Sequence, residues 1–168
     1  ACLFAAPTGT ASFQIKAGAT TLHRLFGIPI GIFRSNSSTE ALVRRTRILK
    51  ASSLIALDEF SMIGRKMLGK MKYRVEEALG AESAGVGVLK SMGGKDVMLS
   101  GDPDQTAPIG DDSLHREGAS KKDGVQGTCD ARGRTKKPPE DAVEGWVLSD
   151  SGLAFFHEFD DVVLLEQR

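Results

Sequence analysis

Short apolar runs, separated by stretches with helical spacing, dominate most of the chain. The clearest run, Leu54-Ile55-Ala56-Leu57, has no polar alternation and ends directly in Asp58 and Glu59. Such a run is typical of a buried strand in a parallel sheet that helices cover on both faces. Further strands are expected over 1–6, 96–102 and 162–165. The pattern therefore predicts an α/β fold with a largely parallel sheet.

Helical spacing predicts four helices between these strands. The first opens after a turn at 7–10 and ends at Gly18, the third spans about 64–80, and the fourth runs through 153–156. The second begins with a capping box formed by Ser37 and Glu40. Its buried stripe is expected to consist of Leu42, Val43 and Leu49. Its basic residues are expected on a solvated face, with phosphate contact as the alternative: Arg44, Arg45, Arg47 and Lys50.

Length and charge narrow the possible functions. The 168 residues suffice for about one domain with a buried core, and 22 basic residues balance 22 acidic ones. A nucleic-acid site would therefore be a local patch. Cys2 and Cys129 are far apart and lack a neighbouring Cys or His at ligand spacing, so neither a disulfide framework nor a zinc site is expected. No membrane span and no signal peptide are predicted. The chain starts at Ala1 inside an expected strand, so we expect a fragment with an upstream part.

Asp58 and Glu59 are the first candidates for chemistry. In parallel sheets, ligands bind outside the carboxyl ends of the strands. One carboxylate there can hold Mg²⁺, directly or through water, and the next can orient or deprotonate an attacking water. The alternative is that both acids cap the following helix, with Ser61 as a further cap candidate.

The other strand ends carry further polar groups. After the first strand, Thr8 or Thr10 can cap a helix whose free amides would donate hydrogen bonds to a phosphate; ordinary capping is the alternative. His23 can face a nucleic-acid strand or simply be a hydrogen-bonded structural residue. After the strand at 96–102, Gln105 stands in a stiff loop beside Asp102, where its amide can sense a terminal phosphate or satisfy a turn.

No phosphate-binding loop of the G-x-x-x-x-G-K-[ST] type is present in the sequence. Gly93-Gly94-Lys95 is rejected because Asp96 follows the lysine and no glycine lies at the required earlier spacing. From 111 to 144 the composition turns to Gly, Ser, Pro and charged residues without apolar periodicity. This segment is expected to be a flexible insertion with no core of its own.

Three signatures, in this order along the chain, identify a family resemblance. They are Ala6-Pro7-Thr8-Gly9-Thr10-Ala11 with Thr21-Leu22-His23 downstream, Asp58-Glu59-Phe60-Ser61-Met62, and Gly101-Asp102-Pro103-Asp104-Gln105. Together they resemble the Pif (petite integration frequency) family of superfamily-one DNA helicases. The resemblance covers the chain from its first residues to Leu165, apart from the insertion.

This resemblance implies a RecA-like P-loop NTPase domain that couples ATP hydrolysis to 5′-to-3′ movement on single-stranded DNA and to duplex unwinding. Residues 1–110 would form most of the first motor domain, 111–144 the insertion and 145–168 the end of that domain. Asp58 resembles the Mg²⁺-associated acid, Glu59 the residue that activates water and Gln105 the γ-phosphate sensor. Gly101 and Asp102 would shape the sensor's loop.

The resemblance also implies residues that contact DNA and an arginine that reaches the nucleotide. Single-stranded DNA would contact the turn and one downstream imidazole: Pro7, Thr8, Gly9, Thr10 and His23. Arg168 ends the chain close to the place where the family has an arginine that reaches the γ-phosphate. The family's phosphate-binding loop is expected just upstream of Ala1, so this chain alone is expected to bind ATP weakly and to be inactive.

The resemblance implies roles in DNA repair, recombination or telomere maintenance, and a nuclear or mitochondrial location. Two other functions compete with this one. One is a P-loop ATPase outside the helicases, which would account for the acidic strand but not for the Pro-Thr-Gly-Thr turn. The other is a non-catalytic, transposon-derived remnant that binds single-stranded DNA or nothing. The sequence gives no oligomeric state.

Overall fold

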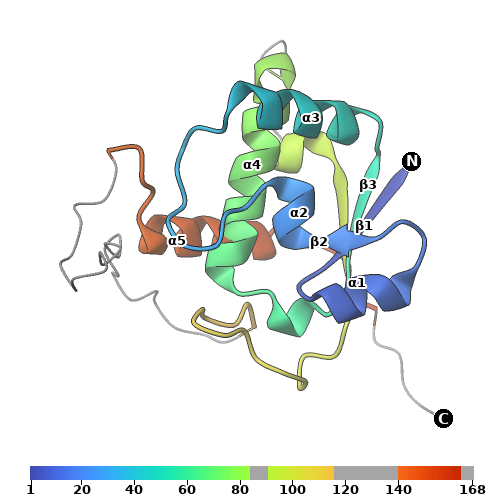
Figure 1. Ribbon diagram of the computed structural model, residues 1–168. Coiled ribbons are helices and arrows are strands. Elements are labelled where there is room, and N and C mark those ends of the chain that lie inside the picture. The colour runs from blue at the N-terminus through green and yellow to red at the C-terminus, as the bar shows by residue number, and fades with distance from the viewer. Residues whose placement is uncertain (84–90, 116–139, 164–168) are drawn as a thin grey trace.

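Four parallel strands form the centre of the computed structural model, which describes residues 1–83, 91–115 and 140–163 (Figure 1). The strands are β1 (Cys2–Ala6), β2 (Thr20–Thr21), β3 (Leu54–Leu57) and β4 (Asp96–Leu99). Their order across the sheet is β2-β1-β3-β4, and all three pairings are parallel. The predicted α/β fold with a parallel sheet is confirmed.

The register brings the strand ends to one edge. Leu57 at the end of β3 pairs with Ala5 of β1 on one side and with Leu99 of β4 on the other. Ala6 in turn pairs with Thr21 of β2. Because all four strands run in the same direction, the loops that follow them start side by side. We call this the carboxyl edge.

Helices pack against the sheet and against one another. They are α1 (Gly9–Ile15), α2 (Leu22–Phe26), α3 (Thr39–Lys50), α4 (Arg65–Ser83) and α5 (Gly145–Phe156), with short 3-10 turns η1 (Phe60–Met62) and η2 (Ser91–Gly94). Helix α4 lies between α3 and α5 and contacts both (Figure 1). The core combines these helices with β3, and its fully buried members are Leu22, Phe26, Leu49, Ile55, Leu57, Ile63, Leu68, Met71, Val75 and Met92.

Cover on both faces of the sheet was expected, but β4 is covered on one face only in the part of the chain that the structure describes. Its residues alternate: Val97 and Leu99 pack against the core, whereas Asp96 is exposed and the Met98 side chain is 47% exposed. The short apolar run at 96–99 did not reveal this alternation because Met98 is itself apolar.

Helix α3 differs from its prediction at the cap and on the buried face. Its N-cap is Ser38, whose hydroxyl accepts a hydrogen bond from the amide of Ala41 at 3.4 Å, rather than Ser37. Of the expected buried stripe, Leu49 is in the core but the Val43 side chain is 63% exposed. Arg45, expected on a solvated face, is buried instead.

Two glycines allow α4 and α5 to cross closely. A Cβ atom added at Gly69 would lie 1.9 Å from the carbonyl oxygen of Leu148, and one at Gly152 would lie 2.0 Å from the carbonyl oxygen of Arg65. Any side chain at these positions would force the helices apart, since interiors are packed without spare volume. The crossing fixes α4, which follows the acidic strand end in sequence.

The expected insertion at 111–144 is ordered at both of its ends. Leu114 is buried in the core, and the amide of Val143 donates to the carbonyl of Phe33 at 2.9 Å. Residues 116–139, with Cys129, lie outside the described residues, so a flexible insertion there stays a prediction. The strand expected at 162–165 is wrong at its start, because Val162 and Val163 are exposed and have no strand partner among the described residues. Leu164 and Leu165 lie outside that part of the chain.

Candidate functional site

Asp58 is held between the two neighbouring strands. Its amide donates to the carbonyl of Ala5 at 2.9 Å, which extends the β1–β3 pairing by one step. Its Oδ1 accepts a hydrogen bond from the hydroxyl of Ser100 at 2.8 Å, just past the end of β4. The carboxylate is partly buried, and one of its oxygens is left for another ligand. Ser100 was not among the predicted site residues, although its position directly after a strand at this edge could have indicated it.

Glu59 has an uncommon backbone conformation. Its φ of 55° and ψ of 46° place it in the left-handed region, where residues other than glycine rarely lie. The turn is closed by Phe60, whose amide donates to the carbonyl of Ser100 at 3.0 Å. Such strain costs about 1–3 kcal/mol and clusters at functional sites. The observed outlier therefore supports a functional role for this strand end, independently of its two carboxylates.

Gly101 lets the loop after β4 approach this strand end. Its φ is 138°, and a Cβ atom there would lie 2.9 Å from the amide nitrogen of Phe60 and 3.2 Å from the Cα of Glu59. A side chain would be strained by both the backbone angle and the contact. The structure thus gives a physical reason for the predicted loop-shaping role of Gly101.

Asp102 closes the turn that presents Gln105. Its Oδ1 accepts the amide of Asp104 at 2.9 Å, and its carbonyl accepts the amide of Gln105 at 3.3 Å. The Gln105 side chain is exposed and has no hydrogen-bond partner within the described part of the chain. The alternative interpretation required the side-chain amide of Gln105 to hydrogen-bond to the turn. It does not do so, and is therefore available to a ligand.

Thr8 caps α1 at the end of β1. Its Oγ1 accepts the amide of Ala11 at 3.2 Å, and its carbonyl accepts both the amide and the hydroxyl of Ser12 at 3.1 and 2.8 Å. Capping, one of the two interpretations of this turn, is therefore confirmed for Thr8. Gly9 and Thr10 follow it and are exposed. Contact of Pro7, Gly9 and Thr10 with a phosphate backbone stays a prediction.

His23 lies in the first turn of α2, at the same edge as the end of β2. Its ring is partly buried and makes no hydrogen bond in the described part of the chain. Burial and the positive charge of Lys70 hold the pKa of His23 below its usual 6.5. Burial likewise lowers the pKa of Lys70, although Asp111 opposes this. Lys70 therefore disfavours the protonated form of His23, and a bound anion would relieve that repulsion.

One interpretation of the sequence made Ser61 a cap of α4, but Ser61 does not cap this helix. Ser61 is buried, and its hydroxyl has no hydrogen-bond partner among the described residues. Asp111, which is more than 40 residues away along the chain, caps the helix instead: its two carboxylate oxygens accept hydrogen bonds from the amides of Lys66 and Met67 at 3.1 and 3.0 Å. Gly64 makes room for that carboxylate, since a Cβ there would lie 2.3 Å from it. Asp58 and Glu59 make no capping hydrogen bond to α4, which leaves them free for other chemistry.

A sequence profile of the PIF1-like helicase family matches residues 1–121. The chain belongs to the PIF1-like helicase family. Among solved structures, it is similar to Pif1 from Bacteroides bound to single-stranded DNA, with 30% identity and a TM-score of 0.50 over 64% of this chain. A complex of Bacteroides Pif1 with ADP-AlF3 and single-stranded DNA gives the same three values. The chain spans 24% of the length of these structures. A search of curated proteins found no match.

The PIF1-like assignment fits the position of the candidate residues. The structure brings Asp58, Glu59 and the Gly101–Gln105 loop together at the carboxyl edge, with Thr8 after the adjacent strand. It excludes Lys95 from this edge, because that residue precedes β4 and its Nζ donates to the carbonyl of Ser52 at 2.6 Å. The rejection of Gly93-Gly94-Lys95 as a phosphate loop is thus supported. Arg168 lies outside the described residues.

Mg²⁺ would be held here by one carboxylate together with a nucleotide. No group of three or more metal-ligating side chains occurs within residues 1–83, 91–115 and 140–163. Sites for Mg²⁺ commonly use one or two carboxylates plus substrate phosphates and water. Asp58 fits such a site, because Ser100 orients its Oδ1 and leaves Oδ2 without a partner in the described chain.

Proposed function

We propose that this chain forms the greater part of the first motor domain of an ATP-dependent DNA helicase. The observation that carries the proposal is the meeting of three loops at the carboxyl edge. The loop after β4 contacts the strained strand end at Glu59 through Gly101 and binds Asp58 through Ser100. ATP hydrolysis would occur there, with Mg²⁺ at Asp58, water activation by Glu59 and phosphate sensing by Gln105.

Single-stranded DNA is the proposed partner at the neighbouring loops. The amide of Asp58 binds β1 directly, so the acids and the Thr8 turn are joined through one backbone pairing. DNA held at Thr8 and His23 would therefore lie next to the nucleotide. The similarity to Pif1 from Bacteroides bound to single-stranded DNA supports this partner. Movement in the 5′-to-3′ direction, and roles in repair, recombination or telomere maintenance in the nucleus or mitochondrion, are further proposals from the family resemblance.

ATPase activity tests the assignment of Glu59. The experiment uses this chain joined to the phosphate-binding loop that its family places upstream, with Glu59→Gln as the variant. Loss of a general base lowers turnover by about 10²–10⁴-fold, so we expect ATP hydrolysis stimulated by single-stranded DNA to fall within that range. Glu76→Gln is a matched control, since that residue pairs with Lys72 on the surface of α4. Unchanged hydrolysis in Glu59→Gln would show that the assignment of Glu59 is wrong, whereas absence of hydrolysis in the parent would favour the non-catalytic remnant.

DNA binding is tested separately with Thr8→Ala combined with His23→Ala. Fluorescence anisotropy with a labelled single strand should show weaker binding, while circular dichroism should show unchanged helix content. Ser38→Ala is the control for cap loss, because it removes the N-cap of α3 without touching the carboxyl edge. If both variants weaken binding equally, the effect of Thr8 is structural and the proposed contact is wrong.

A further inference from the structure

Helix α3 divides its basic residues between the interior and the surface. Arg45 points inward and is paired, whereas Arg44 and Arg47 are exposed. Neither exposed guanidinium has a hydrogen bond or ion pair in the described part of the chain. Glu40 in the first turn is the one acidic residue of this helix. The outer face of α3 therefore carries unneutralised positive charge.

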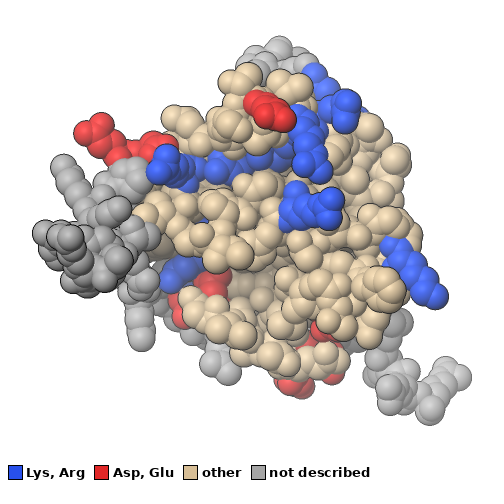
Figure 2. All heavy atoms as spheres, viewed as in Figure 1, with Lys and Arg blue, Asp and Glu red and all other residues tan. Residues whose placement is uncertain are grey.

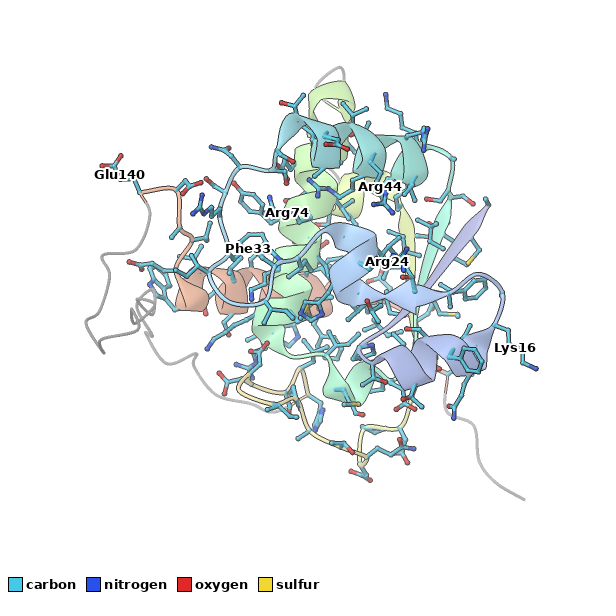
Figure 3. All side chains as sticks on the ribbon, viewed as in Figure 1. Lys16, Arg24, Phe33, Arg44, Arg74 and Glu140 are labelled. Carbon is cyan, nitrogen blue, oxygen red and sulfur yellow. The ribbon has the colours of Figure 1, made fainter. Side chains whose placement is uncertain are left out.

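This charge continues onto α2. Arg24 is exposed and is likewise without a side-chain partner among the described residues. Figure 2 shows Lys and Arg side chains over α2 and α3 on the viewed face, and Figure 3 places Arg24 and Arg44 on that same face. We call Arg24, Arg44 and Arg47 the basic face. The whole chain has no net charge, so this local excess is not a consequence of composition.

The basic face adjoins the proposed single-strand site. Helix α2 begins directly after β2 at the carboxyl edge, and Arg24 is the next residue after His23. A nucleic acid seated at His23 and extending along α2 would meet Arg24 first and then the arginines of α3. Unpaired arginines along such a path attract a polyanion and release its counterions.

The side chains favour a contact with phosphates alone. Single-strand sites usually stack bases on exposed aromatic rings. Apart from His23, which is already placed at the single-strand site, the one aromatic side chain of α2 is Phe26, which is fully buried, and α3 contains no Phe, Tyr or Trp. By contrast, Phe13 on α1, the helix that Thr8 caps, is 84% exposed. Aromatic exposure thus marks the single-strand side, whereas the basic face offers guanidinium groups only. Contact with phosphates alone is typical of duplex binding without base readout.

We propose that the basic face holds the phosphate backbone of a DNA duplex that continues from the single-strand site. The proposal rests on the proposed DNA partner of the carboxyl edge and adds a second surface to it. Arg44 and Arg47, three residues apart on one helix, would contact phosphates without regard to base sequence. Arg24 would join this surface to the single-strand site.

The test uses the full chain and two labelled DNA probes. One is a short single strand, and the other is the same strand extended by a duplex. The variant is Arg44→Gln with Arg47→Gln, which leaves Thr8 and His23 intact. Two lost phosphate contacts should make the slope of log affinity against log salt shallower by about 2 for the duplex probe. At about 0.2 M salt this corresponds to about 20-fold weaker binding. Affinity for the single strand should not change.

Control variants separate charge from position and folding. Lys72→Gln removes a cation that is already paired with Glu76 at 2.9 Å, and should leave both affinities unchanged. The double variant should unfold at the same temperature as the parent, because its two side chains are exposed and unpaired.

Three results would overturn the proposal. Equal weakening with both probes would place the arginines on the single-strand path. Unchanged binding of the duplex probe would exclude the basic face from DNA contact. If the double variant lost binding to vesicles of anionic lipid but kept its DNA binding, the basic face would be a membrane-binding surface. A failure of the proposed function would give a different result, because single-strand affinity would then be insensitive to Thr8→Ala with His23→Ala. The effect of the arginine variant on affinity for the duplex probe could still be measured in that case.

Discussion

Glu77 neutralises two buried arginines, and removing its charge should destabilise the domain strongly. Its Oε2 accepts hydrogen bonds from Arg45 at 2.6 Å and Arg74 at 2.8 Å, and its Oε1 accepts the amide of Ser37 at 2.8 Å. The two guanidinium side chains are only 3% and 4% exposed. The cluster also binds the segment before α3, since Arg74 donates to the carbonyl of Arg34 at 2.9 Å. One carboxylate therefore joins α3, α4 and this segment.

Glu77→Gln keeps the size of the side chain and removes its charge. Breaking a buried pair costs about 3–5 kcal/mol, because the partner is left charged and unpaired. The Glu77 side chain is 16% exposed, and glutamine still offers one acceptor oxygen, so we expect a loss near the lower limit, about 3 kcal/mol. For a domain of this size, such a loss lowers the melting temperature by about 6–12 °C.

The pH dependence gives a second readout of the same cluster. Burial by itself raises the pKa of Glu77, but hydrogen bonds from Ser37 and Arg74 outweigh it and hold the pKa below 4.5. A carboxylate with a lowered pKa in the folded state contributes stability above its unfolded pKa, and this is lost as the pH falls through the folded pKa. The parent should therefore lose its advantage over Glu77→Gln as the pH falls below 4.5.

Urea unfolding followed by circular dichroism, at neutral pH and below pH 4.5, measures both effects. Glu76→Gln, one residue away, is the control, because its pair with Lys72 is exposed and should contribute less than about 1 kcal/mol. Equal stability of Glu77→Gln and the parent at neutral pH would refute the reasoning. So would a difference that persists undiminished in acid.

Three further predictions test other features. Gly152→Ala should destabilise the α4–α5 crossing by about 1–3 kcal/mol in urea unfolding, whereas Gly80→Ala, with open space around it, should stabilise α4 by about 0.4–1 kcal/mol; the reverse order would contradict the packing. Gly101→Ala should cost about 1–3 kcal/mol through its positive φ and disturb the acidic strand end, and normal thermal stability would contradict this. Affinity for single-stranded DNA should rise as the pH falls below 6.5, because phosphate favours the protonated ring of His23 that Lys70 disfavours; His23→Asn should remove the dependence, and a pH-independent parent would exclude this role.

The central sheet was predictable from the sequence, because apolar runs and their polar ends are local signals. Leu54–Leu57 is a strand as predicted, and the parallel order follows from the helices between successive strands. That order alone brings Asp58 and the Gly101 loop to one edge. The candidate site could therefore be located before its geometry was known.

Features that depend on distant partners could not be predicted. Arg45 has the same local pattern as Arg44 and Arg47, yet only Arg45 is buried, because Glu77 and the Phe26 carbonyl lie opposite it. Asp111 stands in a stretch with the composition of a linker, but it caps α4 across more than 40 residues of chain. Helical periodicity indicates which residues share a face of a helix, but not which distant residues pack against that face.

The strand end at Asp58 and Glu59 shows why motif and geometry carry different information. A motif records the two acids, but their placement depends on the left-handed backbone of Glu59 and on a loop so close that a Cβ atom added at Gly101 would lie 3.2 Å from the Cα of Glu59. Glycine at 101 permits that approach, and in the described part of the chain the Ser100 hydroxyl alone fixes the Asp58 carboxylate, at 2.8 Å. A change at either loop residue would therefore disturb the acids while leaving the motif intact. This edge should tolerate substitution less than the apolar core, where swaps that conserve volume cost less than about 1.5 kcal/mol.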